Sequence, residues 1–234
     1  LLNMTHGIID NKQSGIVGDV IKENIMRGSR LSIASAYFTL YAFVELKNEL
    51  KKIDEFRFIF TNPVTEHSSE NIYPEIFGVK EEHRYKIDLN QSYIAKEVAK
   101  WLKDKAQFKK MVDKKIEGGF YHLQSPDGTQ IGMVGGAPFS APGLGFSNST
   151  NYYINNIVKE EQTNYQLLRN FENIWSNDEL LIDVKQDILA HLEKLYQENS
   201  PEFIYFVTLY NIFKDFLEGN RDFNTLQQSI GFED

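Results

Sequence analysis

His122 and the glycine-rich stretch that follows it have the residue types and spacing that could support chemistry. His122 lies in a segment with the character of a strand, and a loop at 135–150 that follows is rich in Gly, Ser, Pro and Asn. An imidazole can attack phosphorus or transfer a proton. Glycine amides that no side chain blocks can cradle phosphate oxygens. These features predict a phosphate-directed site at His122 and the loop beginning at Gly135 and Gly136.

The same residues also allow a structural interpretation. A strand histidine can be a core residue whose ring is hydrogen-bonded in the interior. Glycines in a loop can simply supply backbone freedom. Residue types alone leave both interpretations open.

The rest of the sequence offers few alternatives for catalysis. The other four histidines show no metal-ligand spacing with one another or with carboxylates; they are His6, His67, His83 and His191. The chain has no cysteine, which excludes disulfides and thiolate metal sites. It contains no P-loop, GxSxG or HExxH string. We expect neither a metal nor a cofactor.

The first 61 residues alternate between helical and strand patterns. Apolar residues at helical spacing predict helices over 14–27 and 40–52. Segments rich in β-formers predict strands over 30–38 and 55–61. This alternation is typical of an α/β structure, here a mixed sheet between helices.

A polar stretch over 62–89 reads as a loop, and a long amphipathic helix is predicted over 91–112. Pro126-Asp127-Gly128 is a strong turn signal, so strands over 116–124 and 130–135 should form a hairpin.

The last part of the chain is expected to be mainly helical. The remaining elements expected are a strand over 151–158, a helix over 160–175, and two amphipathic helices over 179–197 and 201–218. Because no strand is expected after residue 178, we place a boundary there. The prediction is an α/β domain over 1–178 and a helical appendage or connector over 179–234.

Composition indicates a chain with a substantial core and no membrane span. The chain has 234 residues, of which 41% are hydrophobic, so it can bury a substantial core. Its apolar runs are short and interrupted by charge, which predicts no membrane span. It also lacks the pattern of a signal peptide. The absence of cysteine fits a reducing compartment, and we expect a cytoplasmic location.

Charge is unevenly distributed. The net charge is −8, yet residues 91–116 hold eight lysines against three acidic residues, a local charge of +5. Such a segment can form a nucleic-acid-binding face. It can equally be the solvated surface of a helix.

Several strings of sequence resemble a known family. They are GIIDN at 7–11, GDVIKENI at 18–25, RLSIASAYF at 30–38, His122-Leu-Gln124, GGAPFSAPGL at 135–144 and Asn173-Ile-Trp175. In their order they resemble the phospholipase D-like domain that precedes a helicase in many bacterial proteins. Residues 200–210 resemble the helical bridge into the helicase. The resemblance implies DNA metabolism as the setting and a downstream helicase domain as a partner.

The resemblance also implies a chemistry. In this family a histidine attacks phosphorus without a metal, a second histidine protonates the leaving group, and Lys and Asn side chains stabilise the charged oxygens. His122 falls at the nucleophile position. One motif supplies one such histidine, so an active site implies a homodimer. The positions implied to contact phosphate are Gln124, Gly135, Gly136 and Ser140.

Three positions of the motif are substituted. Gln124 replaces the family's lysine, Pro138 replaces its asparagine, and Tyr153 replaces the glutamate that orients the histidine. Loss of one transition-state stabiliser lowers the rate by a factor on the order of 10²–10³. The substitutions therefore predict weak or absent catalysis.

Two functions from different classes follow. The first is a DNA-binding or dimerising module, with little or no catalysis, in a helicase or restriction-type protein. The alternative is an active metal-independent endonuclease that uses His122 in a homodimeric site, with Gln124 and a lysine such as Lys114 or Lys115 substituting. A docking domain without a nucleic-acid role is a third option, and salt-sensitive DNA binding would separate it from the first.

Overall fold

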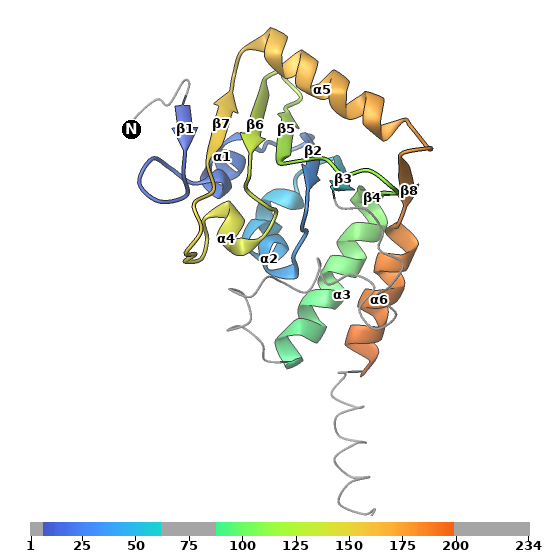
Figure 1. Ribbon diagram of the computed structural model, residues 1–234. Coiled ribbons are helices and arrows are strands. Elements are labelled where there is room, and N and C mark those ends of the chain that lie inside the picture. The colour runs from blue at the N-terminus through green and yellow to red at the C-terminus, as the bar shows by residue number, and fades with distance from the viewer. Residues whose placement is uncertain (1–6, 62–87, 199–234) are drawn as a thin grey trace, which may run out of the picture.

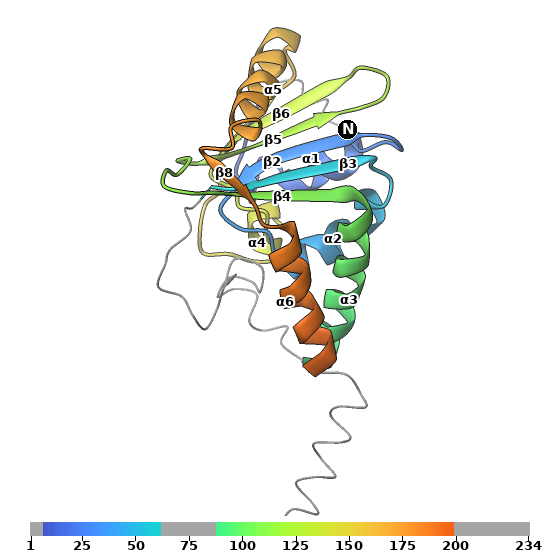
Figure 2. The ribbon, with the colours of Figure 1, turned by 90° about the vertical axis from the view of Figure 1, so that its right-hand side faces the viewer.

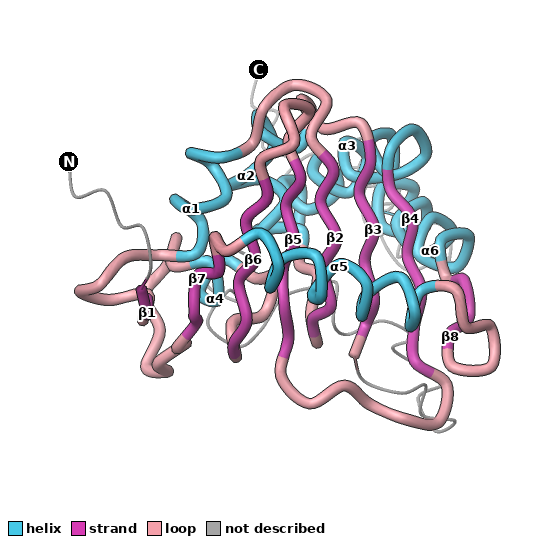
Figure 3. The backbone as a smooth tube through the Cα atoms, turned by 90° about the horizontal axis from the view of Figure 1, so that it is seen from above, coloured by secondary structure: helices cyan, strands magenta, loops and turns pink. Residues whose placement is uncertain are grey.

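The computed structural model describes residues 7–61 and 88–198, and a single mixed sheet forms its centre (Figures 1 and 3). The strands are β1 (Gly7–Ile9), β2 (Arg30–Ser35), β3 (Glu55–Phe60), β4 (Ala106–Met111), β5 (Gly119–Gln124), β6 (Gln130–Gly135), β7 (Asn155–Val158) and β8 (Leu181–Asp183). Their order across the sheet is β1-β7-β6-β5-β2-β3-β4-β8. β2, β3 and β4 are parallel neighbours, and all other neighbours are antiparallel.

Helices lie on both faces of this sheet (Figure 2). They are α1 (Val17–Asn24), α2 (Leu40–Leu50), α3 (Asp88–Lys105), α4 (Ala141–Leu144), α5 (Glu161–Trp175) and α6 (Lys185–Glu198). α5 crosses one face, and the other described helices lie on the opposite face. The expected α/β architecture, a mixed sheet between helices, is confirmed.

The face opposite α5 carries the larger core. Strand alternation places Ile33, Phe58 and Tyr121 on this face, and all three are buried. Phe38, directly after β2, lies among five aromatic rings at centroid distances of 5.0 to 6.5 Å. The loop that follows β2 is therefore anchored in the centre of the core.

The face beneath α5 has a smaller core of its own. Ala34, Ile59 and Phe120 point to this side of the sheet and are buried against Phe171 of α5. Gly132 allows the close approach of the helix, because a Cβ there would lie 2.7 Å from Asn164 Oδ1 and from Leu167 Cδ2. The two cores are separated by the sheet itself.

The prediction of a helix over 91–112 is wrong for its last residues. α3 ends at Lys105, and residues 106–111 form β4, which pairs with β3. No glycine or proline marks the change, and Phe108 fits the helical pattern as well as the strand pattern. Pairing with the open edge of β3 satisfies the backbone groups of this segment, and this tertiary interaction overrides local propensity.

The expectation of no strand after residue 178 is also wrong. β8 pairs with β4 at the sheet edge, and α6 packs against α3. A three-residue strand is too short to show a period in the sequence. The domain division near residue 178 stays a prediction, since the helix expected over 201–218 and the connector after it lie outside the described residues. Most of the loop expected over 62–89 lies outside them as well.

The other predicted elements are present, with adjusted limits. The strand expected over 151–158 begins at Asn155, and the loop over 135–150 contains the short helix α4. In the part of the chain that the structure describes, no helix combines the length and apolar character needed to cross a membrane.

Candidate functional site

A hollow lies at the end of the sheet where β2 and β3 finish and the glycine-rich loop leaves β6. The residues that line it are Ser35, Ala36, Thr61, Lys115, Ile116, Glu117, Gly118, Gly119, Gly136, Ala137 and Pro138. Gly119 forms a tight part of its wall, because a Cβ there would lie 2.8 Å from the carbonyl oxygen of Ala34. We call this the Gly136 hollow.

Internal hydrogen bonds hold the glycine-rich loop beside β2. The Phe139 N–H donates to Ser35 Oγ at 3.1 Å, and the Ala137 N–H donates to Asn155 Oδ1 at 3.3 Å. The Gly136 N–H donates to the carbonyl of Ile154. Pro138 has no N–H to offer. These loop amides are therefore committed to the fold and do not form a phosphate cradle.

The charge at the rim of the Gly136 hollow is balanced. Lys115 Nζ lies 2.9 Å from Glu117 Oε1, and both side chains are exposed. An exposed pair of this kind contributes roughly 0–1 kcal/mol. The two charges cancel at short range, so the hollow offers little net attraction for an anion.

The structure does not bring the five expected site residues together. Gly136 lines the hollow, and nothing lies within 4 Å of the place where its Cβ would be. A Cβ on Gly135, in contrast, would lie 2.3 Å from the Ile154 carbonyl oxygen. Ser140 is buried and caps α4, accepting a hydrogen bond from the Gly143 N–H at 3.1 Å. Gln124 ends β5, at the far end of that strand from the hollow.

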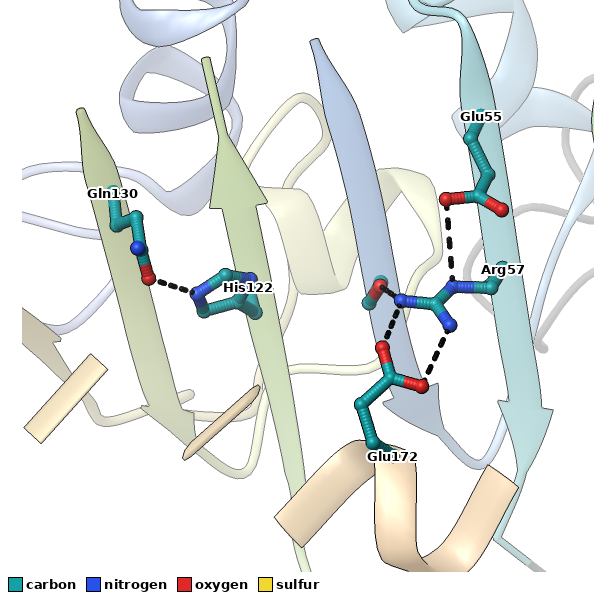
Figure 4. Close-up of polar contacts among 6 residues, drawn as sticks. Glu55, Arg57, His122, Gln130 and Glu172 are labelled. Carbon is teal, nitrogen blue, oxygen red and sulfur yellow. Dashed lines mark hydrogen bonds and ion pairs between the residues drawn. The ribbon is translucent and has the colours of Figure 1, made fainter. Parts of the chain in front are cut away.

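His122 also lies away from the Gly136 hollow. It points to the α5 face of the sheet, in register with Ser32 and Gly132, and only 1% of the residue is exposed. Three residue steps along β5 separate His122 from Gly119, or about 10 Å. The ring Nε2–H donates to Gln130 Oε1 at 3.0 Å (Figure 4). The imidazole is thus a buried, hydrogen-bonded residue of the interior.

Burial is the main influence on the pKa of His122. Loss of water around the ring lowers its pKa, and the positive charge of Arg57 acts in the same direction. The hydrogen bond with Gln130 and the charge of Glu172 oppose this shift but do not reverse it. His122 is therefore neutral at physiological pH.

Arg57 and Glu172 form a polar cluster next to His122 that the sequence analysis did not identify (Figure 4). Arg57 Nη2 and Nη1 lie 2.7 and 3.0 Å from the two carboxylate oxygens of Glu172. Nη2 also donates to Ser32 Oγ at 3.1 Å. The guanidinium stacks 4.9 Å from the centre of the Phe171 ring. This bidentate pair ties α5 to β3.

One signal in the sequence could have pointed to this cluster. Arg57 interrupts the apolar strand Glu55-Phe-Arg-Phe-Ile-Phe60, and a cation in a buried strand requires a partner. The partner lies 115 residues later in the chain. Without the arrangement of the strands, nothing in the sequence connects Glu172 to Arg57.

We expect acid to destabilise the protein through His122. The pKa of His122 is lower in the folded state than the ordinary value of about 6.5 for an unfolded chain. The unfolded state therefore binds the proton more tightly, and stability is lost as the pH falls through this range toward the folded pKa. The loss can reach about 1.4 kcal/mol per pH unit. Denaturant unfolding at pH 7.5 and 5.5 measures it.

The control is His122→Gln, which cannot titrate. Its free energy of unfolding should fall less than that of the wild type between the two pH values. Equal acid loss in the wild type and in His122→Gln would contradict this prediction.

Within residues 7–61 and 88–198, no group of three His, Asp or Glu side chains is placed to hold a metal ion.

Comparison with known proteins gives no family. The sequence matches no protein-family model and no curated protein. Among solved structures, the chain is similar to the phosphatidylserine synthase of Haemophilus influenzae Rd KW20, with 9% identity and a TM-score of 0.44. The match covers 82% of this chain and 43% of the synthase, so the chain spans less than half of that protein.

Proposed function

We propose that this chain is a nucleic-acid-binding α/β module of phospholipase D-like type, without phosphodiesterase turnover, within a larger DNA-processing protein of the helicase or restriction type. The observation that carries the proposal is the position of His122. The one histidine at the family's nucleophile position lies beneath α5, and its ring does not line the Gly136 hollow.

The geometry argues against the alternative of an active endonuclease. A nucleophilic imidazole must reach phosphorus, and the His122 ring is enclosed by α5, Gln130 and the sheet. A homodimer was expected because two histidines would face one another across a shared site. A ring buried inside each subunit gives no reason for that arrangement.

Two observations support nucleic-acid binding. The strings of sequence described above resemble a family from DNA metabolism. The lysine-rich part of the chain has a positive charge although the whole chain carries −8. Exposed lysines of this segment can bind the phosphate backbone without reading sequence.

The test is binding and cleavage of labelled oligonucleotides by the full chain. Fluorescence anisotropy should show binding at 50 mM salt. If two phosphates are contacted, the affinity should fall by about 12-fold at 200 mM salt. The same mixtures with EDTA should show no cleavage on a gel. His122→Gln should bind as the wild type does, because the ring is buried.

Two results would overturn the proposal. One is the absence of salt-sensitive binding to both single-stranded and duplex DNA. The other is cleavage in the presence of EDTA that disappears in His122→Gln.

A further inference from the structure

A second hollow lies between α2 and α3, on the face of the sheet opposite α5. Four lysines line it, together with two aromatic and two acidic residues; they are Lys47, Lys51, Lys100, Lys105, Phe43, Trp101, Glu97 and Asp104. Its lining has a net charge of +2. The Gly136 hollow, with one lysine and one glutamate, has none. We call this second site the lysine hollow.

Two of the four lysines are fixed by other contacts. Lys105 Nζ donates to the carbonyl oxygens of Lys51 and Ile53, at 2.9 and 2.6 Å. Lys47 Nζ forms an ion pair with Glu97. Lys47 joins α2 to the middle of α3, and Lys105 joins the end of α3 to the residues that follow α2. Both contacts hold the walls of the hollow in place.

The C-terminal end of α2 is neutralised at this site. A helix C-terminus presents free carbonyl oxygens with partial negative charge, which repel an anion. Here Trp101 Nε1 donates to the Leu50 carbonyl at 3.0 Å, and Lys105 occupies the carbonyls of Lys51 and Ile53. The end of α2 therefore does not oppose a phosphate in the hollow.

The other two lysines have no partner among the described residues. Lys51 and Lys100 are exposed, one on each side of the hollow, and no described residue forms an ion pair or hydrogen bond with either ammonium group. Charged groups without a protein partner are those that release counterions when phosphate binds.

We infer that the lysine hollow is the phosphate-contacting surface for nucleic acid, with Lys51 and Lys100 making the contacts and Lys47 and Lys105 supporting the walls. This inference rests on the proposed function and gives it a location. It places the bound strand on the α2–α3 surface and not at the Gly136 hollow.

Charge reversal tests the location. In the anisotropy assay with the full chain, Lys51→Glu/Lys100→Glu should lower the affinity for a DNA oligonucleotide by about tenfold or more at 50 mM salt. The dependence of log K on log salt should become shallower by about 2, one for each lost contact. Both positions are exposed, and a cooperative thermal unfolding curve shows that the variant is folded.

Matched variants separate this effect from a change in total charge. Lys114→Glu/Lys115→Glu makes the same double reversal beside the Gly136 hollow. Lys159→Glu reverses one charge at an exposed residue before α5, and it is the control for the single variant Lys100→Glu. Both controls should shift affinity by less than threefold.

Tryptophan emission gives an independent measurement. The chain has two tryptophans, and Trp175 is the last residue of α5, on the other face of the sheet. In a Trp175→Phe background, addition of DNA should change the emission of Trp101, which lines the lysine hollow.

The outcomes distinguish this inference from the proposed function. If the wild type does not bind DNA, both fail. If the wild type binds, Lys51→Glu/Lys100→Glu binds equally well and Lys114→Glu/Lys115→Glu is weakened, the module binds nucleic acid at the Gly136 hollow. In that case the inference fails while the proposed function stands.

Discussion

Phe38→Ala is expected to lower the free energy of unfolding by about 3–5 kcal/mol. Phe38 is 1% exposed and stacks on Phe139 at 5.3 Å, with edge contacts to Phe108 at 5.0 Å and Phe58 at 5.6 Å. Truncation removes the apolar area of the ring and leaves a cavity, which rings on three sides cannot fill without leaving their own contacts.

This substitution also affects the Gly136 hollow. Phe38 is bridged to Phe139, and the Thr39 N–H donates to the Phe139 carbonyl at 3.0 Å, so the ring holds the glycine-rich loop against the end of β2. Urea unfolding measures the loss. Phe38→Leu should lose less, and Tyr152→Ala, at a residue that is 71% exposed, should change stability by less than about 0.5 kcal/mol. A loss below about 1 kcal/mol in Phe38→Ala would contradict the packing described here.

Removal of Glu172 is expected to destabilise the protein more than removal of the charge of Arg57. The Arg57 side chain is 13% exposed and that of Glu172 is 44% exposed. Glu172→Met leaves a mostly buried guanidinium without its bidentate partner, at an expected cost of about 2–3 kcal/mol. Arg57→Met leaves a carboxylate that water can reach, and the Met side chain keeps packing against Phe171, so we expect about 1 kcal/mol.

A double-mutant cycle measures this asymmetry. Arg57→Met/Glu172→Met should be more stable than Glu172→Met alone, because no buried guanidinium is then left with only the longer contact to Glu55, at 3.8 Å. Glu193→Met breaks the exposed pair with Lys103 and should cost less than about 0.5 kcal/mol. Equal losses for the two single substitutions would show that burial of Arg57 does not determine the energy of the pair.

The fold was predictable where local patterns and tertiary structure agree. The alternation of helix and strand through residue 61 and the hairpin at Pro126-Asp127-Gly128 gave the mixed α/β sheet correctly. β4 was not predictable, because residues 106–111 have a pattern compatible with both states, and pairing with β3 decides between them. β8 was too short to carry a period of its own.

The site was less predictable than the fold. A histidine two residues before a polar side chain is compatible with a nucleophile and with an interior residue. Which of the two applies depends on which face of β5 a helix covers, and α5 covers the face of His122. The Arg57–Glu172 pair depends on the same contact between elements distant in sequence. The lysines of 91–116 do not share one surface either. Some lie on α3 and others on or after β4, and Lys110 is buried in β4.

The cover over His122 and Arg57 consists of a single element, since among the described helices α5 alone lies on that face of the sheet. If this helix lifts, water reaches the imidazole and the guanidinium while the aromatic core on the opposite face stays closed. The reaction of His122 with an acylating reagent would therefore report the opening of one helix, and not the unfolding of the whole molecule.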